Sequence, residues 1–200
     1  GVLMGALDIS IVGPAIPSIE QTIHIEPRLL GWIFSVYVLF NLTGIPLFAR
    51  LSDIFGRKNI YIISLLIFAL GSLVVSVAGS FPLLIVGRAI QGFGASGIFP
   101  VASAIVGDSF PAEKRGRILG LLGAVFGFAF IIGPIMAGTL LHYFDWNVLF
   151  LINLPIALLL IVASFKILPN TKVETPDHFD WKGIVGLGLM LGIFAYGISN

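Results

Sequence analysis

Residues 82–107 read PLLIVGRAIQGFGASGIFPVASAIVG, a run whose single charged residue is Arg88. A helix needs about 20 mostly apolar residues to cross the hydrocarbon core of a bilayer. The run lacks the polar–apolar alternation of a membrane barrel strand. It therefore predicts a membrane-spanning helix with an arginine inside it.

Six further apolar runs accompany this one, at residues 1–19, 29–49, 59–79, 118–142, 147–168 and 183–200. The chain has 200 residues, of which 58% are hydrophobic and 10% charged, and its mean hydropathy is +1.07. Soluble domains contain roughly 45–50% apolar and about 25% charged residues. A particle of this size cannot bury the surplus apolar surface, which must therefore face lipid. The sequence predicts an all-α integral membrane protein.

The positions of lysine and arginine predict its orientation, because cytoplasmic loops carry an excess of both. Only Arg28 lies in a connection on one side, whereas nine such residues follow the second, fourth and sixth runs on the other side: Arg50, Arg57, Lys58, Lys114, Arg115, Arg117, Lys166, Lys172 and Lys182. We therefore expect a multi-pass protein of the cell membrane with a cytoplasmic N-terminus.

The sequence lacks the residues that several classes of function need. Cysteine is absent, which excludes disulfides, thiol nucleophiles and cysteine-ligated zinc. His24, His142 and His178 are scattered without metal-ligand spacing, so we predict no metal site. No basic patch suits nucleic acid. No nucleophile–base pair or phosphate loop stands out, so we expect neither an enzyme nor a cofactor.

Both ends of the chain lie in or near apolar runs. Gly1 stands already inside the first run, and Asn200 stands at the end of the last. A cleaved signal peptide needs a basic leader and a small-residue cleavage site, whereas Asp8 interrupts this first run. We interpret the run as a spanning helix and expect the chain to be a fragment of a longer transporter.

Asp8 and Arg88 are the charged residues that fall well inside the runs. Each costs about 2.5–3.5 kcal/mol at a helix centre, so such residues point to function. A structural ion pair, or snorkelling of Arg88 to the surface, is the alternative. Helical periodicity places Arg88 and Gln91 on the same face of the helix, and we expect this face to border a water-filled cavity. The opposite face, with Gly94 and Gly97, either packs against a helix or faces lipid.

Prolines and glycines mark two other runs. Pro14 and Pro17 predict a broken first helix, with an ordinary kink as the alternative. Gly133-Pro134 predicts a bend in the run 118–142. These two residues either allow close packing against another helix or act as a mechanical hinge. Small residues spaced three or four apart predict close packing there: Gly116, Gly120, Gly123, Gly127, Gly133, Ala137 and Gly138.

Aromatic side chains suggest a binding pocket in the second run. Phe34, Tyr37 and Asn41, together with Met4 and Phe99, are candidates for an adaptable aromatic lining. Tryptophans near the ends of runs are typical of interface anchors, which is how we interpret Trp32, Trp146 and Trp181.

Four segments together resemble the drug:proton antiporters of the major facilitator superfamily. Arg50–Lys58, RLSDIFGRK, is similar to the signature between spans 2 and 3, although Ala49 and Ile54 depart from it. The second segment is Arg88–Ala95 in span 4. The third is Gly133–Gly138 in span 5, where Ala129 and Ala137 replace glycines of the family motif. The fourth is Leu7–Pro17 in span 1, where Gly13 and Pro14 depart from the family motif. They stand in the right spans and in the right order.

The resemblance implies a fold of two six-helix halves, each made of two inverted three-helix repeats. Residues 1–168 then form the N-terminal six-helix half, residues 169–182 a cytoplasmic connector and residues 183–200 a seventh span. The short connector and the segment Asp180-Trp181-Lys182-Gly183 favour the fourteen-span branch, with twelve spans as the alternative.

The resemblance also implies efflux of a hydrophobic, often cationic compound in exchange for protons, by a monomer in a bacterial inner membrane. The partners are then the small molecule, protons and the lipid bilayer, and the proton gradient replaces any cofactor. The implied roles are proton coupling by Asp8 and Arg88; a substrate cavity lined by Gln91, Tyr37, Asn41 and Phe34; a cytoplasmic latch of Asp53, Gly56, Arg57, Lys58 and Asp108; and an antiporter hinge at Gly133, Pro134 and Gly138.

Three other hypotheses for the function stay open. The first is a carrier of the same superfamily that moves another small metabolite. The second is a membrane enzyme, which needs clustered His, Asp or Glu at the membrane surface. The third is a non-transporting assembly subunit, in which mutating Asp8 and Arg88 together is silent.

Overall fold

The computed structural model describes residues 1–168 together with Gly183, Gly186 and Met190. In this part of the chain six helical stretches are long and apolar enough to cross a membrane: Val2–Ile23, Pro27–Phe55, Arg57–Ser76, Phe81–Ser109, Ala112–Tyr143 and Asn147–Ile167. They coincide with the first six predicted runs to within a few residues. The connector 169–182 and the predicted seventh span, apart from the three residues named, lie outside the described residues.

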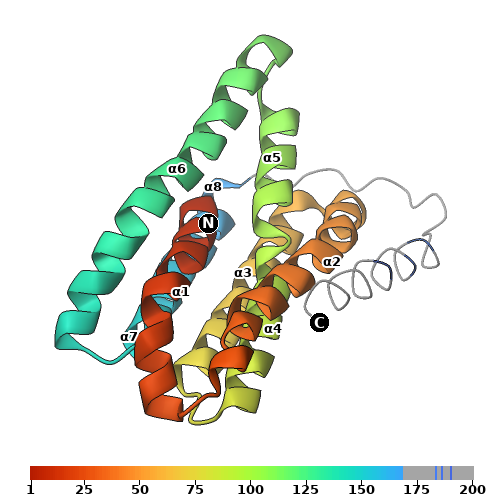
Figure 1. Cartoon of the computed structure of the whole chain (residues 1–200). Helices are drawn as coiled ribbons and strands as arrows, with labels where there is room; N and C mark the ends of the chain where they lie inside the picture. The colour runs from red at the N-terminus through yellow and green to blue at the C-terminus, as the bar shows by residue number, and fades with distance from the viewer. Residues whose placement is uncertain (169–182, 184–185, 187–189, 191–200) are drawn as a thin grey trace.

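The helices form one bundle (Figure 1), with the elements α1 (Val2–Ile23), η1 (Pro27–Leu29), α2 (Gly31–Phe55), α3 (Arg57–Ser76), α4 (Phe81–Ala95), α5 (Ile98–Ser109), α6 (Ala112–Tyr143), α7 (Asn147–Leu151) and α8 (Asn153–Ile167). The α2–α3 and α5–α6 connections lie at one end of the bundle, at the top of Figure 1, and the α1–α2, α3–α4 and α6–α7 connections lie at the other. The chain therefore crosses the bundle back and forth, as repeated membrane crossings require.

The fourth and sixth stretches each consist of two helices, where the sequence predicted one. Proline lacks the backbone N–H that would bond the carbonyl four residues earlier. Pro100 thus cannot donate to the carbonyl of Ser96, between α4 and α5, and Pro155 cannot donate to that of Leu151, between α7 and α8. The second interruption places Asn153 at the start of α8.

The predicted break in the first helix is wrong. Helix α1 runs without interruption from Val2 to Ile23 and contains both Pro14 and Pro17. Helix α6 likewise continues through Pro134. Because neighbouring helices and side chains can satisfy the freed backbone groups, proline within a spanning helix need not end it.

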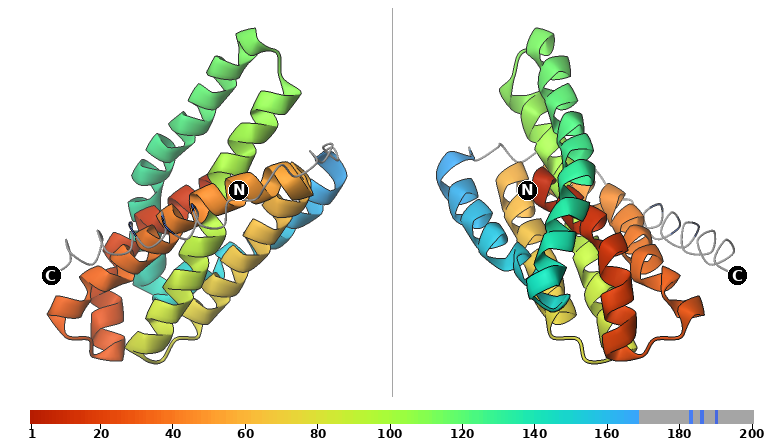
Figure 2. Two further views of the ribbon diagram at one scale, coloured as in Figure 1. Left: turned by 90° about the vertical axis from the view of Figure 1, so that its right-hand side faces the viewer. Right: turned by 60° about the vertical axis from the view of Figure 1, so that its left-hand side comes forward.

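Helix α4 packs against both α2 and α3 (Figure 2), and glycines set the closeness of that packing. A methyl group at Gly94 would collide with the backbone nitrogen of Phe68 on α3, and one at Gly92 would collide with the carbonyl of Tyr37 on α2. On α3, Gly71 meets the backbone of Gln91 in the same way. The face of α4 that carries Gly94 therefore packs against a helix and does not face lipid.

The small residues of α6 behave differently from one another. Gly133 lies directly against Ser10 of α1, and Ala129 and Ala137 are fully buried. A methyl group at any of five other glycines would meet nothing within 4 Å in the described part of the chain: Gly116, Gly120, Gly123, Gly127 and Gly138. The predicted close packing is therefore present at Gly133 and Ala137, and the described residues leave the five other glycines uncovered.

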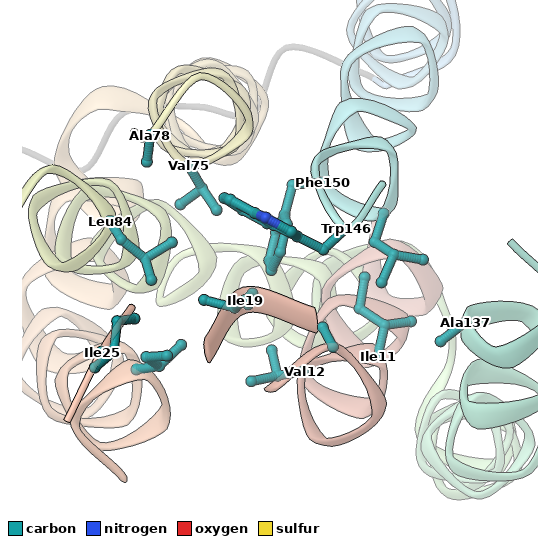
Figure 3. Packing of buried hydrophobic residues seen from close by; sticks show 13 residues of the cluster. Ile11, Val12, Ile19, Ile25, Val75, Ala78, Leu84, Ala137, Trp146 and Phe150 are labelled. Atoms are coloured by element: carbon teal, nitrogen blue, oxygen red, sulfur yellow. The ribbon is translucent and has the colours of Figure 1, made fainter. Parts of the chain in front are cut away.

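Trp146 belongs to the interior, contrary to its interpretation as an interface anchor. Its side chain is 1% exposed and packs in a cluster with Phe150, Ile11, Ile19 and Val75 (Figure 3). The two rings make an edge-to-face contact with centroids 6.1 Å apart. Because α7 begins directly after Trp146, the packing of Trp146 in this cluster ties the start of the sixth stretch to α1 and α3.

We predict that Gly94→Ala destabilises the protein by about 1–3 kcal/mol, because the added methyl group has no room against α3. Thermal unfolding of the detergent-solubilised protein measures this loss. The matched control is Gly120→Ala, a change in a helix where the methyl group meets open space and alanine is the better helix former. Equal melting temperatures for the two variants would contradict the packing described here.

Candidate functional site

The two intramembrane charges, Asp8 and Arg88, meet in the middle of the bundle. Nη1 of Arg88 lies 2.9 Å from Oδ2 of Asp8, and both side chains are 0% exposed. Helix α1 supplies the carboxylate and α4 the guanidinium. Arg88 therefore does not snorkel to the surface. An ion pair this deeply buried is stable only if further hydrogen bonds satisfy both partners.

Two side-chain amides complete the hydrogen bonding of the carboxylate. Oδ1 of Asp8 accepts from Nε2 of Gln91 at 2.7 Å and from Nδ2 of Asn153 at 2.8 Å. Gln91 also accepts from Nη1 of Arg88 at 2.6 Å. The carboxylate thus accepts three hydrogen bonds, one of them from a cation.

Ser72 of α3 joins the two amides. Its hydroxyl oxygen accepts from Nε2 of Gln91 at 2.8 Å and from Nδ2 of Asn153 at 3.3 Å. We name Asp8, Ser72, Arg88, Gln91 and Asn153 the polar layer. All five side chains are buried, and they come from α1, α3, α4 and α8.

Ser72 and Asn153 were not predicted from the sequence. Asn153 could have been noticed in the sequence, because it is a side-chain amide in the middle of the apolar stretch LFLINLPIALLL. Serine gives no such signal. A serine in a spanning helix commonly bonds a carbonyl of its own helix, as Ser64 does with Ile60, so its presence points to nothing.

Arg88 makes three further contacts. Its Nε donates to the carbonyl of Ile33 at 3.1 Å. Its guanidinium carbon lies 4.2 Å from the ring centroid of Tyr37 and 5.8 Å from that of Phe150. A desolvated cation–π contact is worth about 2 kcal/mol, so the rings help hold the charge. Its Nη2 has no hydrogen-bond partner in the described part of the chain.

The polar layer separates two hydrophobic clusters along each membrane-spanning stretch that contributes to it. On α1, Asp8 lies between Met4 of one cluster and Ile11 of the other. In the sixth stretch, Asn153 lies between Phe150 of α7 and Ala157 of α8. Arg88 and Gln91 are 0% exposed, and apolar clusters pack on both sides of the layer, so in the described part of the chain this face is closed instead of bordering the expected water-filled cavity.

A cavity of about 160 Å³ lies next to the layer. Tyr37, Asn41 and Phe99 line it, as expected for a substrate cavity, together with Gly5, Ala6, Ile9 and seven further residues. Tyr37 contacts the cavity on one side and Arg88 on the other. Tyr37 thus lies between the cavity and the ion pair.

Three other candidates for the cavity lie elsewhere. Gln91 belongs to the polar layer and donates to Asp8. Phe34 is 45% exposed on α2 and does not line this cavity. Met4 is 3% exposed and packs in a hydrophobic cluster.

A second charge cluster lies at the end of the bundle where α2, α3 and α5 meet. Arg57 pairs with Asp53 and with Asp108, whose Oδ2 lies 3.1 Å from Nε of Arg57. Its Nη1 also donates to the hydroxyl of Ser52 at 2.7 Å. The cluster thus has the composition that the sequence resemblance implied, and it links the α2–α3 connection to α5.

Gly56 and Lys58 complete the turn that holds this cluster. Gly56 separates α2 from α3 with φ 90°, a left-handed conformation that glycine adopts without strain. Lys58 donates to the carbonyl of Phe165 at 2.8 Å, which ties the start of α3 to the end of α8. Both residues therefore hold helix ends together.

Of the three predicted hinge residues, only Gly133 packs against α1 near Asp8 in the described part of the chain. Gly133 contacts Ser10, two residues beyond Asp8 on α1. Pro134 and Gly138 are exposed in the described part of the chain. Within that part, no three His, Cys, Asp or Glu side chains come together as metal ligands.

Comparisons with known proteins agree with this architecture. A model of the Major Facilitator Superfamily matches residues 1–200. The chain is 39% identical over its whole length to the uncharacterized MFS-type transporter YfiU of Bacillus subtilis, and 33% identical over 94% of its length to multidrug resistance protein 3 of the same organism. It spans 39% and 36% of the lengths of these two relatives.

Among solved structures, the human organic anion transporter MFSD10 (TETRAN) has a similar fold. The TM-score is 0.76, and the match covers 94% of this chain and 50% of that one. The sequences are 19% identical, so this likeness concerns the fold alone.

We predict that Arg88→Gln destabilises the protein by about 3–5 kcal/mol, because it leaves the Asp8 carboxylate buried without its cation. The double variant Asp8→Asn with Arg88→Gln removes both charges and should recover part of this loss. Thermal unfolding in detergent of the two single variants and the double variant measures the coupling. Strictly additive effects would contradict a paired, sealed site.

Proposed function

Because the chain belongs to the major facilitator superfamily, we propose that it forms the N-terminal half of a proton-coupled antiporter that exports hydrophobic or cationic compounds by alternating access. The superfamily consists of membrane transporters, and a relative named multidrug resistance protein 3 supports an efflux role. The chain spans about two fifths of the length of its curated relatives, so the proposal concerns the whole transporter.

One observation carries the proposal. Asp8, a titratable group, is fully buried against Arg88, and Tyr37, whose ring covers Arg88, is also one of the residues that line a cavity. While Asp8 is ionised, the pair is neutral and a cation is tolerated in the cavity. When Asp8 takes up a proton, the charge of Arg88 is uncompensated and repels that cation. Proton and substrate therefore compete, as exchange requires.

The lining of the cavity supports the class of compound. Tyr37, Phe99 and Phe126 provide aromatic surface, and Asn41 provides a polar contact. Drug-sized ligands occupy pockets of about 300–1,000 Å³. A cavity of about 160 Å³ is thus one part of the binding site, and the second half of the transporter supplies the rest.

The cluster of Arg57, Asp53 and Asp108 supports a latch. Its ion pairs connect the turn between α2 and α3 to the end of α5. We propose that the cluster closes one end of the transporter and opens during alternating access, with Gly133-Pro134 of α6 as the hinge beside α1. Partly exposed ion pairs of this kind are weak enough to break in each cycle.

The positive charges gathered at this end support a cytoplasmic location for it and for the N-terminus. We propose that the transporter acts as a monomer in a bacterial inner membrane, with protons, the exported compound and lipid as its partners. A carrier of another metabolite is the alternative, and the assay below separates the two.

We predict that Asp8→Asn abolishes proton-coupled efflux while the protein still inserts. The assay uses inverted vesicles with an acidic lumen that contain the full-length transporter, to which lipophilic cations are added. Antiport moves the cation inward and protons outward, so the lumen becomes more alkaline. The matched control is Asp145→Asn, which removes an exposed carboxylate in the α6–α7 connection and should leave transport unchanged.

Coupled transport that persists in Asp8→Asn would overturn the role of Asp8. If the unaltered transporter is inserted but gives no alkalinisation with any cation of the panel, the compound class is wrong and a metabolite carrier becomes the better proposal.

We predict that Asp53→Asn and Asp108→Asn each lower the transport rate about two- to five-fold, because each removes one ion pair worth up to ~1 kcal/mol from the latch. The same vesicle assay measures the rates. Glu113→Gln, an exposed change in the first turn of α6, serves as control. Unchanged rates in both latch variants would reduce the role of the turn to setting topology.

A further inference from the structure

Asn153 is a member of the polar layer that the proposed exchange of proton and substrate does not use. Asn153 touches neither Arg88 nor the cavity, yet its Nδ2 donates to Oδ1 of Asp8 at 2.8 Å. It is 4% exposed and stands at the first position of α8, where Pro155 interrupts the sixth stretch. An amide at this depth is costly unless its hydrogen bonds are used.

We propose that Asn153 is a positioning residue for Asp8: it sets the pH at which the carboxyl exchanges its proton and connects that event to α8. The inference rests on the proposed function for its role in transport. The effect of Asn153 on Asp8 is inferred from the geometry alone.

The hydrogen-bond inventory supports the first part. Oδ1 of Asp8 accepts from two amides, and Oδ2 accepts only from Arg88. An amide N–H donates a stronger hydrogen bond to a charged carboxylate than to a neutral carboxyl group, and a proton on Oδ1 would compete with the two amides for the lone pairs of that oxygen. Asn153 and Gln91 therefore favour the ionised form of Asp8 and direct an incoming proton toward Oδ2.

Ser72 fixes the orientation of both amides. Its hydroxyl oxygen accepts one hydrogen from each, which leaves the remaining hydrogen of each amide aimed at Oδ1 of Asp8. Because two neutral donors and one hydroxyl lock each other in place, the site is organised before the proton arrives.

The surroundings of Asp8 contain few other groups that titrate. In the part of the chain that the structure describes, the charged or titratable side chains facing it are Arg88 of α4 and, behind the guanidinium, Tyr37 of α2. The other helices packed there present neutral groups: Ser72 of α3, Gln91 of α4, Gly133 of α6 and Asn153 of α8. A change at Asn153 therefore acts on Asp8 without a competing titration.

The second part follows from the helices that these bonds connect. The bonds from Asn153 to Asp8 and to Ser72 join α8 to α1 and α3 in the membrane interior. Protonation of Asp8 weakens the first bond and keeps the second. Helix α8 then stays with α3 while α1 is released, which gives the proton a direct mechanical consequence.

The test measures the protonation of Asp8 directly in the full-length transporter. Infrared difference spectra across a pH series detect the carboxyl C=O band of protonated Asp8, and Asp8→Asn identifies that band. Asn153→Leu keeps the size of the side chain and removes the donor. A hydrogen bond to a charged group is worth about 1.5–3 kcal/mol, so we expect the midpoint to rise by about one to two pH units.

Two further variants make the result specific. Ser72→Ala leaves Asn153 in place but frees both amides, and we expect a smaller upward shift. Asn147→Leu removes an amide from the same stretch that bonds the carbonyl of Ser76, outside the polar layer, and we expect no shift. If Asn153→Leu does not fold, Ser72→Ala carries the test.

Each outcome decides one of the two proposals. A folded Asn153→Leu or Ser72→Ala whose Asp8 band titrates as in the unaltered protein would overturn the positioning role, even if proton-coupled efflux is observed. A shifted band in a protein that shows no proton-coupled transport would sustain the positioning role and overturn the proposed function. With both proposals correct, the pH profile of efflux moves upward together with the band.

Discussion

The burial of the Asp8–Arg88 ion pair is the constraint on which the rest of the structure depends. Removing a carboxylate or a guanidinium from water costs several kcal/mol each, and mutual attraction offsets this only with good geometry and further hydrogen bonds. Gln91, Asn153 and Ser72 provide the bonds, and the ring of Tyr37 covers the cation. Because these groups come from five helices, satisfying one charge pair fixes how α1, α2, α3, α4 and α8 meet.

Glycine makes this arrangement possible. Helix α4 reaches α2 and α3 closely enough for its polar side chains to bond across them only because Gly71, Gly92 and Gly94 carry no side chain. On the opposite side of α1, Gly133 admits α6 against Ser10. The ion pair is therefore enclosed by backbone contacts on several sides, and a change in its protonation acts on helices rather than on loops.

Much of this was predictable from the sequence, and the limits have physical causes. Apolar length located the six described spans, and helical periodicity placed Arg88 and Gln91 on one face. A pairing of Arg88 with Asp8 was among the expectations, because these are the two charged residues well inside the runs. Asn153 and Ser72 were not predicted because the hydrogen bonds that give them a role join different helices, between residues 19, 81 and 145 positions apart. Trp146 was misinterpreted because its position near a helix end resembles an anchor, whereas tertiary packing buries it.

The central claim is that Asp8 holds its proton in competition with the substrate. The most direct measurement is proton release from the purified full-length transporter in weakly buffered detergent solution, followed with a pH indicator as a lipophilic cation is added. The account predicts that the cation releases protons from the unaltered protein, most strongly near the pH midpoint of Asp8, and none from Asp8→Asn. Binding of the cation without proton release, or release that is unchanged in Asp8→Asn, would contradict it.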